Sequence, residues 1–147
     1  MNIKRILLLV LLVIVIIGGI NLMGSRQKPE FKGIHNLSIV PLGEQGYRYT
    51  GWIEVYNPSI FQLRLSAINL QFELNQKQVG TLENPINLNI SAKETGRYPF
   101  ELRFNKTDFD ITNATTLDAH FKGSLSNTSL FSKVNVNIDT IETVTIK

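Results

Sequence analysis

Cysteine is absent from the 147 residues of this chain. Its absence excludes a fold stapled by disulfides and every reaction that needs a thiolate. It also excludes the lipid anchor of bacterial lipoproteins, which requires a cysteine after an apolar N-terminal stretch, because here Leu22-Met23-Gly24 is followed by Ser25. It assigns no compartment, since a domain with an adequate core can be secreted without disulfides.

Histidine is scarce as well, with only His35 and His120 in the chain. A catalytic nucleophile needs a base within hydrogen-bond reach and a third group that orients the base. Two isolated histidines without a neighbouring carboxylate cluster are also poor zinc ligands. We expect His120 on the solvated face of a strand and His35 at the margin of the first strand. The sequence therefore predicts a protein that is not an enzyme, with no catalytic, metal-binding or cofactor-binding residue and no cofactor.

The chain has no basic cluster, although its net charge is +3 and its pI about 9.3. Lys4 and Arg5 contribute two units to this net charge, so the remainder of the chain carries only +1. A nucleic-acid-binding surface needs a stripe or patch of Lys and Arg, which the remainder of the chain lacks. We therefore predict no nucleic-acid partner.

An apolar run opens the chain directly after Lys4 and Arg5. As a helix, residues 6–23 would be about 27 Å long, close to the roughly 30 Å hydrocarbon core of a bilayer. Small residues are missing where a signal peptidase would cut, which favours an anchor over a removed signal peptide. Residues 1–25 are therefore predicted to be a single-pass membrane anchor or signal peptide. The positive-inside tendency predicts a cytoplasmic N-terminus and an extracytoplasmic domain, periplasmic or extracellular.

Residues 26–33 are polar, include Pro29 and are predicted to be a linker. From residue 34 to residue 147, apolar and polar residues alternate in segment after segment, which is typical of half-buried strands. Turn residues separate the segments at Leu42–Gly46, at Asn75–Lys77 and at Lys93–Gly96. Seven or eight strands with one apolar face each indicate two antiparallel sheets packed face to face. The sequence thus predicts an all-β sandwich over 34–147.

Asn57-Pro58 ends one of these strands. Proline cannot donate to a strand ladder, and asparagine can hydrogen-bond its own backbone in a turn. We interpret the pair as a structural motif at a strand end; a binding contact is the alternative.

The stretch from Trp52 to Phe104 resembles the LEA type 2 family, also called WHy (water stress and hypersensitive response) domains. The resemblance rests on an ordered pattern: a strand ending in Asn-Pro, an apolar run, a second strand, a turn followed by Val-Gly, and a polar closing strand. Here these parts are Ile53–Ser59, Phe61, Leu63, Leu65, Ile68–Leu74, Val79-Gly80 and Ile90–Ala92. Gln76-Lys77 replaces the family's turn glycine, which leaves the turn geometry open. The resemblance implies a β-sandwich related to immunoglobulin and fibronectin type III folds and a non-enzymatic role, often protection during water stress.

Two further features allow other interpretations. Asp108, Asp110 and Asn113 form an acidic cluster, but the glycine and the terminal glutamate of a calcium loop are missing, which favours a polar loop. The aromatic residues on the second strand are Tyr47, Tyr49, Trp52 and Tyr56. Core packing is the usual reason for such residues, and Trp52 is the one most expected at the surface, because it shares a face with Glu54.

Together these observations predict a membrane-tethered, LEA type 2-like domain that acts as a binding module or as a stress-protection module against desiccation or osmotic shock. The alternative is a lipid-binding protein or an accessory protein of an envelope complex. The expected partners are the membrane, through the N-terminal helix, and a lipid or an envelope protein. An unpaired edge strand, such as Thr143–Lys147, would be a natural docking site for a protein partner.

Overall fold

The computed structural model describes residues 3–25, 27–107, 111, 115–128 and 133–146. A helix, α1 (Ile3–Ser25), is followed by seven strands. The strands are β1 (Glu30–Pro41), β2 (Tyr47–Tyr56), β3 (Leu63–Leu74), β4 (Lys77–Ile90), β5 (Thr95–Phe104), β6 (Thr116–Thr128) and β7 (Lys133–Thr145). A short 3-10 helix, η1 (Gly43–Gln45), joins β1 to β2. The all-β prediction and the two turns at η1 and between β3 and β4 are confirmed.

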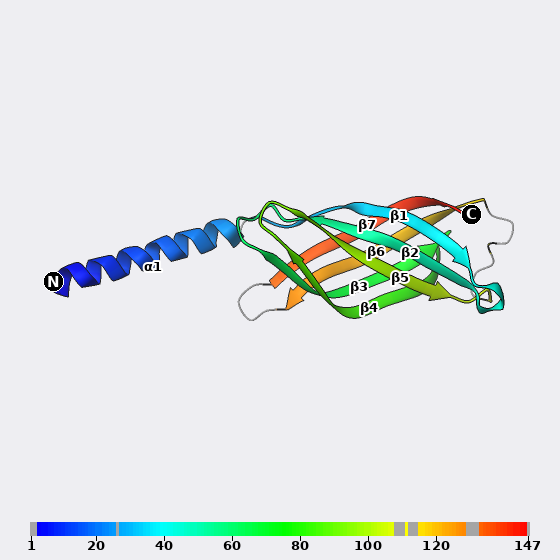
Figure 1. The fold of residues 1–147 in the computed structure, drawn as a ribbon, viewed down its shortest axis with the longest axis horizontal. Coiled ribbons are helices and arrows are strands. Elements are labelled where there is room, and N and C mark those ends of the chain that lie inside the picture. The colour runs from blue at the N-terminus through cyan, green and yellow to red at the C-terminus, as the bar shows by residue number, and fades with distance from the viewer. Residues whose placement is uncertain (1–2, 26, 108–110, 112–114, 129–132, 147) are drawn as a thin grey trace.

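The strands form two antiparallel sheets. Sheet A has the order β1-β2-β5, and sheet B has the order β4-β3-β6-β7. The sheets lie face to face, with β1 beside β7 along one edge and β4 beside β5 along the other (Figure 1). Pro85 in β4 and Pro99 in β5 lie on edge strands, where a missing N–H costs least. Along each side of the sandwich, an edge strand of one sheet thus lies next to an edge strand of the other.

Strand β1 begins at Glu30, inside the segment predicted to be a linker. The alternation of β1 is interrupted by two register shifts, one between Phe31 and Gly33 and one between His35 and Ser38. Each shift puts an extra residue into the strand and turns the following side chains to the other face. The alternation of apolar and polar residues therefore reveals only the last part of this strand in the sequence.

The turn between β3 and β4 forms without the glycine that the family resemblance led us to look for. Leu74 pairs with Lys77, so the loop has only Asn75 and Gln76. Both have positive φ angles, 48° and 68°, as a type I′ hairpin turn requires. Asparagine tolerates this conformation best among the non-glycine residues.

Helix α1 projects from one end of the sandwich (Figure 1). Apolar side chains from Ile6 to Ile17 are each at least 42% exposed. In the described part of the chain, no helix is both long and apolar enough to cross a membrane. The predicted single-pass transmembrane helix and the extracytoplasmic location derived from it are therefore wrong.

The core lies between the sheets and is built around aromatic rings. Tyr49 of β2 packs against Phe72 of β3 with ring centroids 4.6 Å apart, and against Phe121 of β6 at 5.8 Å. Phe100 of β5 approaches Phe121 edge-on at 5.7 Å. Each of these side chains contributes about 1.5–3 kcal/mol by leaving water. The rings therefore hold the two sheets together across the middle of the sandwich.

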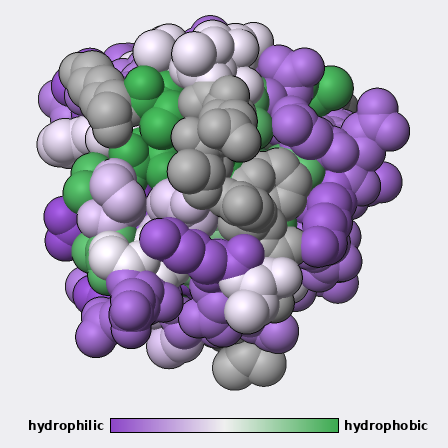
Figure 2. Space-filling model, turned by 90° about the vertical axis from the view of Figure 1, so that its right-hand side faces the viewer, coloured by the Kyte–Doolittle hydropathy of each residue, from purple (hydrophilic) through white to green (hydrophobic). Residues whose placement is uncertain are grey.

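The end of the domain opposite α1 carries both hydrophilic and hydrophobic residues on its surface. Hydrophilic residues gather on the right and lower sides of this end, and hydrophobic residues are visible on its left side (Figure 2). Ile111 is 3% exposed and belongs to the core. The acidic cluster of Asp108, Asp110 and Asn113 lies outside the described residues, so the interpretation of that cluster stays a prediction.

The hydroxyl of Tyr49 is energetically unfavourable in this core. Its side chain is fully buried, and its hydroxyl finds no hydrogen-bond partner among the described residues. Burial raises the pKa of Tyr49 well above its usual value, and the charge of Glu142 adds to the shift. The hydroxyl is therefore kept neutral and desolvated.

We expect Tyr49→Phe to raise the free energy of unfolding by about 1 kcal/mol, because it removes an unpaired buried hydroxyl and keeps the ring. Urea denaturation followed by circular dichroism measures the change. Phe72→Leu, which removes a ring from the same cluster, should instead lower stability by about 1 kcal/mol. A loss of stability in Tyr49→Phe would show that the hydroxyl has a partner.

Candidate functional site

Asn57 is the only polar residue in the described part of the chain that is fully buried, at 1% exposed. It follows the last residue of β2. Its Nδ2 donates to the carbonyl oxygens of Phe61, Ser91 and Ile90, at 2.8, 3.0 and 3.1 Å. Its Oδ1 accepts from the backbone N of Ser59 at 3.1 Å. One amide thus satisfies backbone groups from two separate loops, which is why it can be buried at little cost.

The backbone around Pro58 continues this connection. Asn57 N donates to the carbonyl of Glu94 at 2.9 Å, and Lys93 N donates to the carbonyl of Ser59 at 3.2 Å. The Lys93 ammonium donates to the carbonyl of Pro58 and, at 3.4 Å, to Gln27 Oε1. The Asn-Pro segment is therefore tied to the β4–β5 turn and to the segment that follows α1. These contacts are of the kind that a structural motif at a strand end makes, and neither residue lines either of the two depressions described below.

His120 lies between two carboxylates on the outer face of sheet B. Its Nε2 is 2.7 Å from Asp139 Oδ1 of β7, and its Nδ1 is 3.3 Å from Glu73 Oε2 of β3. These hydrogen bonds, that to Asp139 first, raise the pKa of His120, against a smaller opposite effect of burial. The bond from His120 also lowers the pKa of Asp139. His120 thus links three neighbouring strands through charge-assisted hydrogen bonds.

The sequence did not reveal these carboxylates, because Glu73 and Asp139 lie far from His120 along the chain. Only strand pairing brings them together, with Glu73 opposite His120 in the ladder between β3 and β6. The nearby hydroxyls are engaged elsewhere: Thr143 donates to Asp118 at 3.1 Å and Thr140 to Glu142 at 3.2 Å. The arrangement is an ion-pair network of His120 with two carboxylates.

His35 forms a second network on the outer face of sheet A. Glu54 Oε1 accepts from Arg97 Nε at 2.8 Å, and Glu54 Oε2 lies 3.2 Å from His35 Nε2. The hydrogen bond from Arg97 is the main reason that the pKa of Glu54 is lowered, opposed by partial burial and aided by the charges of Arg97 and His35. The predicted surface position of Trp52 is confirmed here, since its side chain is 41% exposed, whereas Tyr47 and Tyr49 belong to the core.

Each histidine borders a shallow depression. The first, of about 340 Å³, is lined by Glu73, Asn75, Gln76, Asp118, His120 and Ile141. The second, of about 270 Å³, is lined by His35, Asn36, Trp52, Glu54 and Arg97. Among the described residues, no group of three or more His, Asp or Glu side chains is arranged to hold a metal ion. Both depressions offer hydrogen-bonding groups, and the second also offers an aromatic face.

Replacing Asn57 should test how much of the fold depends on its amide. We expect Asn57→Ala to lower the free energy of unfolding by about 3 kcal/mol, because it leaves buried carbonyl groups without a donor. Asn57→Asp should cost at least as much, since a carboxylate would face three carbonyl oxygens. Urea denaturation measures both, with the exposed Asn89→Ala as the matched control. Equal stability of Asn57→Ala and Asn89→Ala would contradict the structural role.

The His120 network predicts a pH dependence of stability. Because the folded-state pKa of His120 is raised, its contribution is fully present below about pH 6.5, its unfolded value, and is lost as the pH rises through the folded value. The lowered pKa of Asp139 makes that residue's contribution present above about pH 3.8 and lost below it.

Urea denaturation at pH 5.5 and at pH 8.5 should therefore show a larger loss of stability with rising pH in the original protein than in His120→Gln. Asp139→Asn should reduce the difference in part, since Glu73 remains beside the imidazole. The same pH dependence in His120→Gln as in the original protein would refute this assignment.

The comparisons with known proteins give a likeness of fold. No family model matches the chain, and no curated protein matches its sequence. The solution structure of a protein from Arabidopsis thaliana is similar over 80% of this chain and 82% of its own, with a TM-score of 0.65 and 11% identity. A crystal structure of a protein from Archaeoglobus fulgidus is similar over 80% of this chain and 98% of its own, with a TM-score of 0.56 and 11% identity. At this identity, the two structures show that the chain shares their two-sheet fold.

Proposed function

We propose that this chain is an LEA type 2-like domain with a sandwich related to immunoglobulin and fibronectin type III folds. Its role would be non-enzymatic: a binding or protective module during desiccation or osmotic stress. The observation that carries the proposal is the Asn57 amide, which makes the Asn-Pro pair of the resemblance the point where several loops are joined.

The order of the resemblance agrees with the order of the elements. Ile53 to Pro58 covers the end of β2 and the loop after it, and Leu63 opens β3. The Val79-Gly80 pair lies on β4, and Ile90 ends that strand beside the Asn57 amide. The pattern therefore describes one continuous structural unit, in which the Asn-Pro loop contacts the far end of the following hairpin.

The outer face of sheet B has the chemistry that a protective surface needs. Asn69, Ser124 and Asn137 share one row across β3, β6 and β7. In the next row Gln71 pairs with Lys122. Uncharged amides and hydroxyls both donate and accept hydrogen bonds, so they can replace water on the surface of a neighbouring molecule as it dries.

Lipid binding and docking at an edge strand are weaker candidates. The two depressions bordered by the histidines are lined mainly by polar residues, which does not suit an acyl chain. Strand β7 does lie at the edge of sheet B, but β1 of the other sheet runs beside it. No contact in the described structure favours a particular protein partner.

The proposal predicts that the purified chain protects another protein during drying. An enzyme that loses activity on dehydration, such as lactate dehydrogenase, would be dried and rehydrated with the chain or with an equal mass of albumin. We expect a larger recovered fraction of activity with the chain, because its polar sheet faces supply hydrogen bonds as water leaves. Recovery no better than with albumin would overturn the protective role.

A destabilised variant tests whether protection requires the folded domain or only the presence of added protein. Asn57→Asp should protect less than the original chain after drying at a temperature at which only the original remains folded. Asn89→Ala should protect as well as the original, because it leaves the loop connection intact.

A further inference from the structure

Trp52 lies on the central strand of sheet A with its side chain toward solvent. Its strand, β2, is paired on both sides, and Trp52 stands opposite His35 of β1 and Pro99 of β5. Ladder bonds on both sides hold the backbone of a central strand in place. Even so, 41% of this large side chain is exposed. The molecule thus presents an aromatic face on a rigid support, where an apolar ligand surface could stack.

Strand β1 is irregular beside Trp52. Asn36 has a φ of 54° within the strand, and the register shifts between His35 and Ser38. As a result the consecutive residues His35 and Asn36 are both exposed, although neighbours in a regular strand point to opposite faces. Gly33 makes room for the imidazole, because a Cβ there would lie 3.2 Å from His35 Nε2. Bulges of this kind are common where a side chain is re-aimed toward a functional site.

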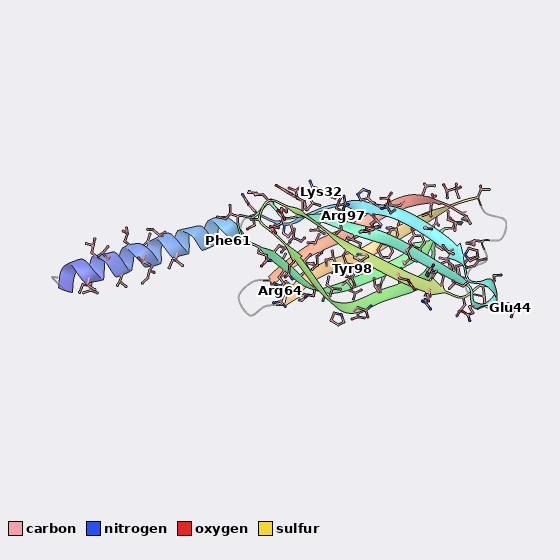
Figure 3. The ribbon with its side chains drawn as sticks, in the orientation of Figure 1. Lys32, Glu44, Phe61, Arg64, Arg97 and Tyr98 are labelled. Atoms are coloured by element: carbon pink, nitrogen blue, oxygen red, sulfur yellow. The ribbon has the colours of Figure 1, made fainter. Side chains whose placement is uncertain are left out.

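The polar groups around the ring are fixed in position. The Glu54 side chain is 17% exposed and is held between Arg97 and His35. The Arg97 side chain is 66% exposed. Figure 3 labels Arg97 near Lys32, in the half of the domain nearer α1. Trp52, Asn36 and these three residues line the same depression of about 270 Å³. The depression therefore combines one aromatic face with a carboxylate, a guanidinium, an imidazole and an amide.

The charges of this depression favour a neutral ligand. The carboxylate of Glu54 and the guanidinium of Arg97 cancel, so an anion would meet Glu54 and a cation would meet Arg97. A ligand that suits the depression has an apolar face for the indole and several hydroxyls for the planar polar groups. A pyranose ring has both, with C–H groups on one face and hydroxyls around its rim.

We propose that the depression around Trp52 is a binding site for a neutral pyranose sugar. The indole of Trp52 contacts the C–H face of the ring, while Glu54 accepts from a hydroxyl and Arg97 and Asn36 donate to others. The volume of about 270 Å³ lies just below the range of about 300–1,000 Å³ for ligand sites, so we expect the depression to take a single sugar ring. Because the site is open to solvent, the Kd should be on the order of 1 mM. This inference does not depend on the protective role.

Trp52 also provides the measurement, because it is the only tryptophan of the chain. Its fluorescence would be recorded during titration of the full chain with maltose, and with glycerol as a hydroxyl-bearing solute without a pyranose face. We expect a saturable change in intensity or emission wavelength with maltose and only a small linear change with glycerol. A linear response to maltose equal to that of glycerol would overturn the proposal.

Two variants locate the binding. Glu54→Gln keeps the shape of the side chain and removes its charge, and we expect the Kd for maltose to rise about tenfold. Glu101→Gln is the matched control: Glu101 lies on β5 and is paired with Arg103 at 2.8 Å, outside the depression, so the Kd should not change. An unchanged Kd in Glu54→Gln, or equal losses in both variants, would refute the assigned site.

Replacing Trp52 removes the fluorophore, so binding to that variant has to be measured by a second method. In Trp52→Ala, saturation-transfer NMR on maltose should lose the signal seen with the original chain, while the circular dichroism spectrum stays the same because Trp52 contributes to the surface rather than to the core. Persistent saturation transfer in Trp52→Ala would place the sugar elsewhere and overturn the proposal. The drying assay is independent of this test, so failure of one does not imply failure of the other.

Discussion

The contact between aromatic rings of opposite sheets is the interaction on which the rest of this structure depends. Tyr49 from sheet A lies against Phe72 and Phe121 from sheet B, and those two rings are 5.1 Å apart. A sheet that is apolar on one face must bury that face against another element, and here sheet A buries it against sheet B. Once the rings fix the distance between the sheets, every outward position on β2, β3 and β6 is fixed as well. The candidate surfaces are thus a consequence of how the core packs.

The Asn57 amide solves a different problem, at one end of the sandwich. Loops that cross from one sheet to the other expose carbonyl groups that no strand ladder satisfies, and burying such groups unpaired is costly. A single side chain with two donors and an acceptor supplies partners to both loops. The motif that most resembles the LEA type 2 family is therefore explained by backbone satisfaction, and it requires no ligand.

Those faces differ in character. Sheet B has an outer face that carries amides and hydroxyls beside charged groups, among them Lys122 and a histidine linked to carboxylates on the strands on either side. Sheet A has an exposed indole beside an ion pair and a distorted edge strand. The first is suited to many weak hydrogen bonds over a broad area, and the second to one small ligand of defined shape. In the proposed function and at the proposed sugar site, hydrogen bonding and stacking would supply the interaction energy.

The sequence alone determined the strands and their inward faces, because side chains alternate strictly along a strand and a misplaced register would put apolar residues in water. It also identified Trp52 as the outward aromatic residue and Asn57-Pro58 as a strand end. It misled at the N-terminus, where an apolar run was interpreted as a membrane span, and it hid the first half of β1, whose bulges break the alternation. Only the tertiary structure decided which residues stand beside His120, Glu54 and Asn57. Their partners come from strands and loops up to 47 residues away, and no local pattern records which strands pair.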